Sequence, residues 1–204
     1  MDELGLFPLP LVLLPTERIP LHIFEERYKE LIGECLDGEG EFGLVLAEDE
    51  GVREVGTRAG VIEVLQRYDD GRLDIVVEGR GRFRVVELTE GRSFHTAVVE
   101  AHEDEVDGPA PRPKAEQALA RYRRLARVAE AEADDPDPGS PLLSYELAAR
   151  VDFGAQRKQT LLELRSEPER LDLVSRLLVD ATRVLARERE LREIASRNGK
   201  PRGR

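Results

Sequence analysis

The chain has 204 residues, of which 40 % are hydrophobic and 36 % charged, a composition typical of a folded globular protein. Its net charge of −11 is uneven: residues 1–110 hold 26 acidic and 11 basic side chains (−15), and residues 111–204 hold 16 acidic and 20 basic ones (+4). The acidic front half and the absence of tryptophan argue against a nucleic-acid surface. Without a membrane-length apolar run or a basic signal-peptide region, we expect a cytoplasmic protein that binds no membrane.

Short apolar or alternating segments in the front half predict β-strands. They are residues 4–14, 42–47, 58–68, 72–78, 79–87 and 94–100. The Pro-rich first segment is typical of an edge strand or of one that closes a small barrel. Asp69-Asp70-Gly71 predicts a hairpin turn. One helix is predicted at residues 24–36, and Cys35 falls on its apolar face, so we expect a buried side chain there and not a nucleophile.

The back half has a helical pattern after a proline-rich break. Predicted helices are residues 114–133, 142–151, 155–165 and a long one that begins at Ser166. The predicted organisation is therefore a β-barrel subdomain at 1–103, a linker at 104–113, a helical bundle at 114–197 and a disordered basic tail at 198–204. Strands followed by helices, without alternation, define an α+β fold.

Residue patterns typical of catalysis are missing from the sequence. There is no phosphate-binding Gly-x-x-x-x-Gly-Lys-Ser/Thr loop and no Gly-x-Ser-x-Gly nucleophile turn. His22, His95 and His102 are not spaced as metal ligands. Gly79-Arg80-Gly81 lies between strand segments with no helix after it, so it predicts a bulge or bend. We expect a protein without catalytic residues, metal or cofactor.

Two blocks near the N-terminus carry a resemblance to a known family. They are Phe-Pro-Leu-Pro at residues 7–10 and Pro-Leu-His-Ile-Phe-Glu-Glu-Arg-Tyr at residues 20–28. Both resemble the opening of the N-terminal substrate-binding domain of Lon proteases, although Leu14 stands where that family often has Phe. Shorter blocks match in family order at residues 42–43, 55–57, 70–73, 78–84, 147–148, 158–163 and 169–171.

The resemblance implies a PUA-like small β-barrel with one inserted helix, followed by a C-terminal helical bundle. In full-length Lon proteases this domain engages substrate polypeptides, and ATPase and Ser–Lys protease domains follow it. This sequence ends after the bundle, so we expect a free-standing, non-catalytic module that binds unfolded or hydrophobic polypeptide segments, as an adaptor or modulator of a separate protease. The alternative is RNA binding, because PUA-like barrels elsewhere serve that use and the back half carries +4.

The motif residues divide into candidate binding residues and structural ones. His22, Phe24, Arg27 and Tyr28 are candidates to border a peptide-binding groove, which needs exposed apolar surface with a polar rim. Structural roles are expected for Pro8, Pro15, Pro20, Leu21, Glu25, Gly43, Gly56, Gly79 and Phe83.

Overall fold

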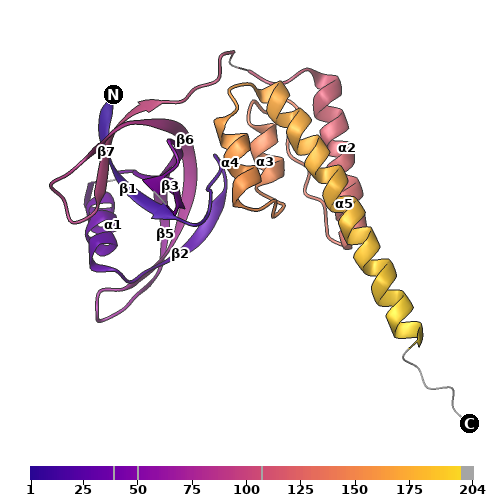
Figure 1. Ribbon diagram of the computed structural model, residues 1–204, viewed down its shortest axis with the longest axis horizontal. Helices are drawn as coiled ribbons and strands as arrows, with labels where there is room; N and C mark the ends of the chain where they lie inside the picture. The colour runs from indigo at the N-terminus through magenta and orange to yellow at the C-terminus, as the bar shows by residue number, and fades with distance from the viewer. Residues whose placement is uncertain (39, 50, 107, 199–204) are drawn as a thin grey trace, which may run out of the picture. The chain divides into compact units, whose positions relative to one another are not determined.

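The computed structural model describes residues 1–38, 40–49, 51–106 and 108–198, and Figure 1 shows its elements. The described residues form two compact units, one from residues up to 106 together with 148–166, and the other from 108–147 together with 167–198. Strands make up most of the first unit, and helices make up the second. The predicted α+β class is confirmed. The unit boundaries differ from the sequence-based division, because helix α4 (Ala155–Glu163) belongs to the strand-containing unit.

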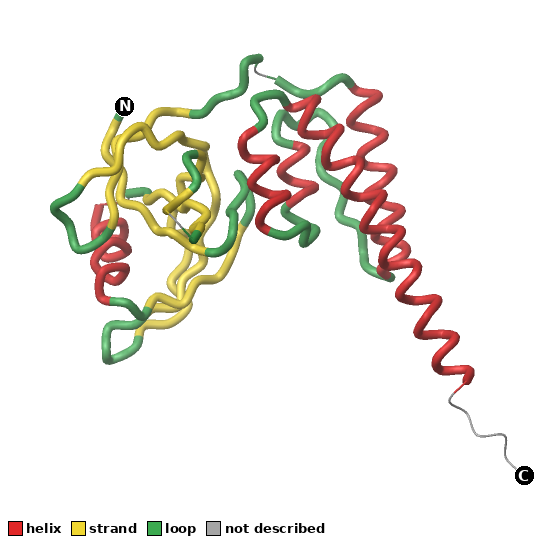
Figure 2. The backbone as a smooth tube through the Cα atoms, in the orientation of Figure 1, coloured by secondary structure: helices red, strands yellow, loops and turns green. Residues whose placement is uncertain are grey.

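The described part of the first unit contains a seven-stranded sheet (Figure 2). Its strands are β1 (Asp2–Leu9), β2 (Arg18–Ile23), β3 (Phe42–Glu48), β4 (Gly51–Val52), β5 (Val55–Arg67), β6 (Leu73–Thr89) and β7 (His95–Ala101). The strand order is β1-β7-β6-β5-β3-β4, and β2 pairs with β6 outside this order. The pairings are antiparallel except for a parallel pairing of β1 with β3. This pairing closes a cycle of five strands, in the order β1-β7-β6-β5-β3 and back to β1. The first strand therefore has partners on both sides, so of its two predicted roles the edge strand is wrong.

Strands β5 and β6 are long and irregular. The sequence predicts two strands at residues 72–87, but β6 is one strand of 17 residues that runs through Gly79. In the pairing of β5 with β6, one register shift adds a residue to β6 at Arg80-Gly81, where the sequence predicts a bulge or bend, and two add residues to β5 at Ile62 and Leu65. In the pairing of β6 with β7, one shift falls at Val86 of β6. The three apolar residues among them are exposed. Because a bulge re-aims its side chain, the irregularities turn apolar side chains of β5 and β6 toward solvent.

The glycines of the sequence motif make room for the core. A Cβ atom built on Gly43 or Gly56 would lie 2.6 or 2.7 Å from Cζ of Phe83, whose ring is fully buried. A Cβ atom on Gly79 would lie 2.1 Å from the carbonyl oxygen of Leu14. Real side chains do not tolerate contacts this short, so only glycine fits at these positions without a shift of the neighbours.

Helix α1 (Glu26–Gly38) covers part of the sheet and completes the larger core cluster of the first unit. The Phe7 ring stacks on Tyr28 with centroids 4.0 Å apart. Leu31, Ile32 and Cys35 are also buried against this cluster, as the helical spacing predicts. The helix therefore fixes the position of the chain that enters it from β2.

Helix α4 is held against the strands of its unit by polar contacts. Lys158 Nζ donates to Glu17 Oε1 at 2.5 Å, and Gln159 Nε2 donates to the Val55 carbonyl at 3.1 Å. Arg82 donates to the carbonyl oxygens of Leu162 and Leu164, at the C-terminal end of the helix. These contacts explain why this helix groups with the strands.

The second unit contains the helices α2 (Arg112–Ala129), α3 (Leu143–Ala148) and α5 (Glu167–Asn198). The boundary between the units falls after Leu147, so the last residue of α3 belongs to the first unit. Helices α2 and α5 pack along their apolar faces. A buried ion pair of Glu167 with Arg170 is completed by Ser144, whose backbone N–H and hydroxyl both donate to the carboxylate. The predicted disordered tail at 198–204 lies outside the described residues after Asn198. None of the described helices is both long and apolar enough to cross a membrane.

Candidate functional site

An exposed group of aromatic rings lies where β2 ends and the β5–β6 hairpin turns. The ring centroid of His22 lies 5.9 Å from that of Phe24 and 6.0 Å from that of Tyr68. We call these three residues the aromatic cluster. Phe24 is 60 % exposed, which is unusual for a large apolar side chain. The cluster therefore offers apolar surface to a partner.

Asp74 on β6 organises the aromatic cluster. Its Oδ1 lies 2.5 Å from His22 Nδ1, and its Oδ2 accepts a hydrogen bond from the Tyr68 hydroxyl at 2.7 Å. The hydrogen bond with His22 has the largest effect on the Asp74 carboxyl and lowers its pKa, and the hydrogen bond from Tyr68 lowers it further. The hydrogen bond between Tyr68 and Asp74 also raises the pKa of the Tyr68 phenol. Since the carboxylate is held by both rings, it fixes their positions with respect to each other.

Charged side chains surround the aromatic cluster. The Arg72 guanidinium lies 4.9 Å from the centroid of the Tyr68 ring and donates to Asp70 at 2.7 Å. Lys29 Nζ on α1 donates to the Asp70 carbonyl at 2.9 Å and thereby ties the hairpin turn to the helix. Gly71, with φ of +84°, allows the turn that the Asp-Asp-Gly sequence predicts. The site thus combines an apolar centre with a charged rim.

The four candidate binding residues lie in different environments. His22 and Phe24 are exposed in the aromatic cluster. Arg27 is half-buried, pairs with Glu25 at 2.8 Å and covers the Tyr28 ring at 4.5 Å. Tyr28 is only 5 % exposed and belongs to the core, where burial raises the pKa of its phenol. The exposed surface therefore includes the first two of these residues, whereas Tyr28 lies in the core.

Two residues of the site are missing from the sequence-based candidates, namely Tyr68 and Asp74. They flank the predicted hairpin turn, so the turn itself was the available signal for their proximity. Their approach to His22 depends on β2, which pairs His22 with Asp74 and which the sequence does not predict as a strand. Pro20 in the middle of β2 obscures its alternation of Ile19, Leu21 and Ile23 with polar residues.

The prolines and other structural candidates occupy strand and corner positions. Pro8 lies in β1 opposite Val45, Pro15 is buried in the corner before β2, and Pro20 is exposed in β2. Leu21 is half-buried against the core, and the Glu25 carbonyl accepts the Tyr28 N–H at 3.0 Å.

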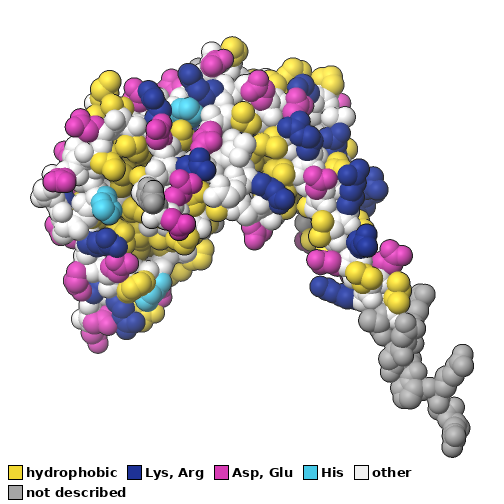
Figure 3. Space-filling model, viewed as in Figure 1, with side chains coloured by type: hydrophobic (Ala, Val, Ile, Leu, Met, Phe, Trp, Pro, Cys, Tyr) yellow, Lys and Arg dark blue, Asp and Glu magenta, His cyan; other side chains and the backbone are white. Residues whose placement is uncertain are grey.

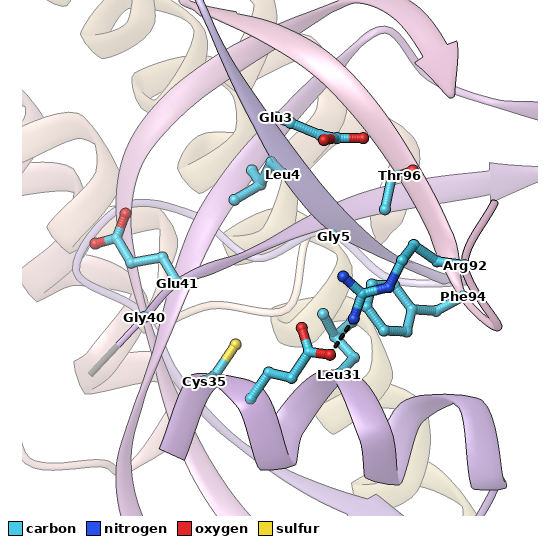
Figure 4. Close-up of a pocket in the computed structure, with 11 residues that line it drawn as sticks. Glu3, Leu4, Gly5, Leu31, Cys35, Gly40, Glu41, Arg92, Phe94 and Thr96 are labelled. Carbon is cyan, nitrogen blue, oxygen red and sulfur yellow. Dashed lines mark hydrogen bonds and ion pairs between the residues drawn. The ribbon is translucent and has the colours of Figure 1, made fainter. Parts of the chain in front are cut away.

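A cavity of about 300 Å³ lies elsewhere in the first unit (Figure 4). It is bordered by β1, α1 and the segment before β7, and the salt bridge of Arg92 with Glu34 lies at its edge. Cys35 contributes a thiol, but burial, together with the nearby Glu34 and Glu41 carboxylates, raises its pKa to about 11. A thiol with this pKa is protonated at neutral pH and is a poor nucleophile. The cavity therefore lacks an activated nucleophile at Cys35.

Among the side chains that the structure describes, no group of three or more His, Cys, Asp or Glu residues is placed to hold a metal ion. Figure 3 shows hydrophobic side chains interspersed with charged ones on the visible faces of both units. The aromatic cluster, with its exposed Phe24, is the candidate functional site.

Comparison with known proteins identifies the family. The model of the ATP-dependent protease La (Lon) substrate-binding domain matches residues 3–180, so the chain belongs to this family. The crystal structure of a Lon N-terminal domain protein from Xanthomonas campestris is 25 % identical, with a TM-score of 0.65 over 84 % of this chain and 96 % of that one. The N-terminal domain of a Mycobacterium avium complex Lon protease shares the fold, with a TM-score of 0.64, 17 % identity and coverage of 89 % and 98 %.

Curated relatives are much longer than the present chain. The chain is 26 % identical over 95 % of its length to a Lon protease of Trichlorobacter lovleyi, and the match covers 26 % of that protein. It is 29 % identical to Lon protease 2 of Myxococcus xanthus and 30 % identical to a Lon protease of Anaeromyxobacter dehalogenans, in each case over 82 % of this chain and 22 % of the relative. The chain therefore spans about a quarter of these relatives, and the similarity concerns their substrate-binding part.

Proposed function

We propose that this protein binds unfolded polypeptide segments rich in apolar residues through the aromatic cluster of His22, Phe24 and Tyr68. The observation that carries the proposal is the exposure of Phe24 beside two further rings, in a chain of the Lon substrate-binding family. Folded proteins bury most of their apolar side chains, so a site of this kind selects chains that have not folded.

The energy available from this surface supports reversible binding. Covering the exposed part of one phenylalanine removes on the order of 100 Å² of apolar surface from water, which contributes about 2.5 kcal/mol at 25 cal/mol per Å². Part of this gain offsets the ordering of the bound segment. A surface of a few such rings therefore gives weak, rapidly reversible binding, which suits a module that samples many chains.

We further propose that the bound segment is passed to a protease, in the manner of an adaptor or modulator. The relatives are Lon proteases, and the part of them that matches is their substrate-binding domain. We also infer that the five-strand cycle is a small PUA-like barrel, since pairing of β1 with β3 leaves neither strand with an open edge in the cycle. Neither proposal requires a cofactor.

Isothermal titration with a reduced and carboxymethylated model protein tests the binding function. We expect heat of binding with the unfolded form and none with the same protein in its native, disulfide-bonded form. The absence of heat with the unfolded form at high micromolar concentrations would contradict the proposed function. Equal binding of both forms would contradict the selection of unfolded chains.

A further inference from the structure

Strand β2 borders the aromatic cluster and has a hydrogen-bonded partner on only one side. It pairs with β6 from Arg18 opposite Glu78 to Ile23 opposite Leu73. Within the part of the chain that the structure describes, no strand pairs with the other side of β2, and no backbone hydrogen bond reaches its residues from there. The strand therefore has an open edge of six residues.

One hydrogen bond determines which backbone groups point to the open edge. The Gly79 N–H donates to the Glu17 carbonyl at 2.9 Å, so this carbonyl points toward β6, while the Gly79 carbonyl accepts from the Thr16 N–H. Bonded and non-bonded pairs alternate in an antiparallel ladder. Ile19, Leu21 and Ile23 are therefore bonded to β6, and Arg18, Pro20 and His22 direct their backbone groups away from it.

The side chains agree with this assignment. Residues in non-bonded pairs lie closer together than those in bonded pairs. Arg18 contacts Glu78 at 2.7 Å and His22 contacts Asp74 at 2.5 Å, each directly across the strands. The open edge consequently presents the N–H and C=O groups of Arg18 and His22 and the C=O group of Pro20.

The two sides of this edge differ in polarity. Ile19 and Leu21 are half-buried at the margin of the core, whereas Arg18, Pro20 and His22 are exposed on the opposite side of the strand. Successive side chains of an added strand would point alternately to these two sides. A segment with apolar residues at every second position would place them against Ile19 and Leu21, and its other residues beside His22.

We propose that β2 binds an extended polypeptide segment as an added β-strand, through hydrogen bonds to the backbone of Arg18 and His22. This inference rests on the proposed function, because the segment is the unfolded polypeptide that also contacts the aromatic cluster. Backbone hydrogen bonds are independent of side-chain identity, so strand addition binds many sequences. Pro20 has no N–H, and this missing donor limits permanent pairing of the edge with other strands.

Amide hydrogen exchange, followed by NMR on the complete chain, tests the proposal. The probe is a ten-residue synthetic peptide in which valine and phenylalanine alternate with threonine and lysine. In the free protein we expect slow exchange at Ile19, Leu21 and Ile23 and fast exchange at Arg18 and His22. Saturation with the peptide should slow exchange at Arg18 and His22 by about tenfold or more, because both amides become hydrogen-bonded.

The outcomes separate strand addition from surface binding. Slower exchange at Arg18 and His22 supports strand addition. Shifts of the Phe24 and Tyr68 ring signals without slower exchange at these amides overturn strand addition and leave the proposed function intact. The absence of both effects contradicts the proposed function as well.

Peptides N-methylated at alternate residues provide a second readout. Methylation of one alternate set removes the donors that face β2, and methylation of the other set leaves them in place. We expect binding to be lost with the first set and retained with the second. An equal effect of both sets would overturn the proposal, because binding by side chains alone does not distinguish them.

Discussion

Replacement of Gly79 by alanine should strongly destabilise the first unit. The added Cβ atom would lie 2.1 Å from the Leu14 carbonyl oxygen and 2.9 Å from its carbon, both of them backbone atoms that cannot rotate away. Overpacking of this kind costs about 1–3 kcal/mol. The shift would also weaken the bonds from Thr16 N–H to the Gly79 carbonyl and from Gly79 N–H to Glu17, at about 1 kcal/mol each. We therefore expect G79A to lower the free energy of unfolding by about 3–5 kcal/mol.

Urea denaturation followed by circular dichroism measures this loss, and the same strand provides the control. Apart from its neighbours along the chain, no atom of the described residues lies within 4 Å of a Cβ atom built on Gly81, two residues further along β6. G81A should therefore leave stability unchanged or raise it by about 0.5 kcal/mol, because alanine restricts the unfolded chain. Equal stabilities of G79A and G81A would refute the argument that the approach of Leu14 requires glycine.

Three further predictions concern buried ionisable groups of the first unit. Because burial raises the pKa of Cys35 to about 11, iodoacetamide at pH 8 should modify it slowly in the folded protein and rapidly in urea; equal rates would show an accessible thiolate. Burial lowers the pKa of His102 below its ordinary 6.5, so the unfolded chain takes up the proton first and stability should fall as the pH drops below 6.5. His102→Gln should remove this part of the pH dependence in urea titrations, and an unchanged profile would argue against it. Lys158→Ala leaves the buried carboxylate of Glu17 without the cation that pairs with it and should cost about 3 kcal/mol in thermal or urea unfolding. Arg183→Ala, which breaks an exposed pair, should cost under about 0.5 kcal/mol; similar losses from both variants would contradict the reasoning.

Periodicity predicted the elements whose apolar side chains all face one way. Helix α1 follows the spacing of Leu31, Ile32 and Cys35, and the structure buries all three. The β5–β6 turn follows from Asp-Asp-Gly, since glycine adopts the positive φ found at Gly71. Local patterns of this kind depend on neighbouring residues only, so the sequence carries them directly.

Features that depend on pairing between distant segments were not predictable in this way. The pattern of β2 is interrupted by Pro20, and its role becomes clear only when β6 lies beside it. Tyr68 and His22 are 46 residues apart, and Asp74 joins them through that pairing. Likewise, nothing in the helical pattern of residues 155–165 shows that Lys158 and Gln159 contact the strands. The candidate site was therefore found only in part.

The most direct test of polypeptide binding compares two pairs of exposed apolar residues on the same unit. Phe24 and Tyr68 belong to the aromatic cluster, whereas Val86 and Leu88, 48 % and 57 % exposed, lie at the other end of β6. Serine replacements in each pair should leave stability nearly unchanged, because the side chains are exposed. In fluorescence anisotropy with a labelled unfolded protein, F24S/Y68S should weaken binding by about tenfold or more, equal to about 1.4 kcal/mol, while V86S/L88S binds like the unaltered chain. Equal affinities of the two variants would contradict binding at the aromatic cluster.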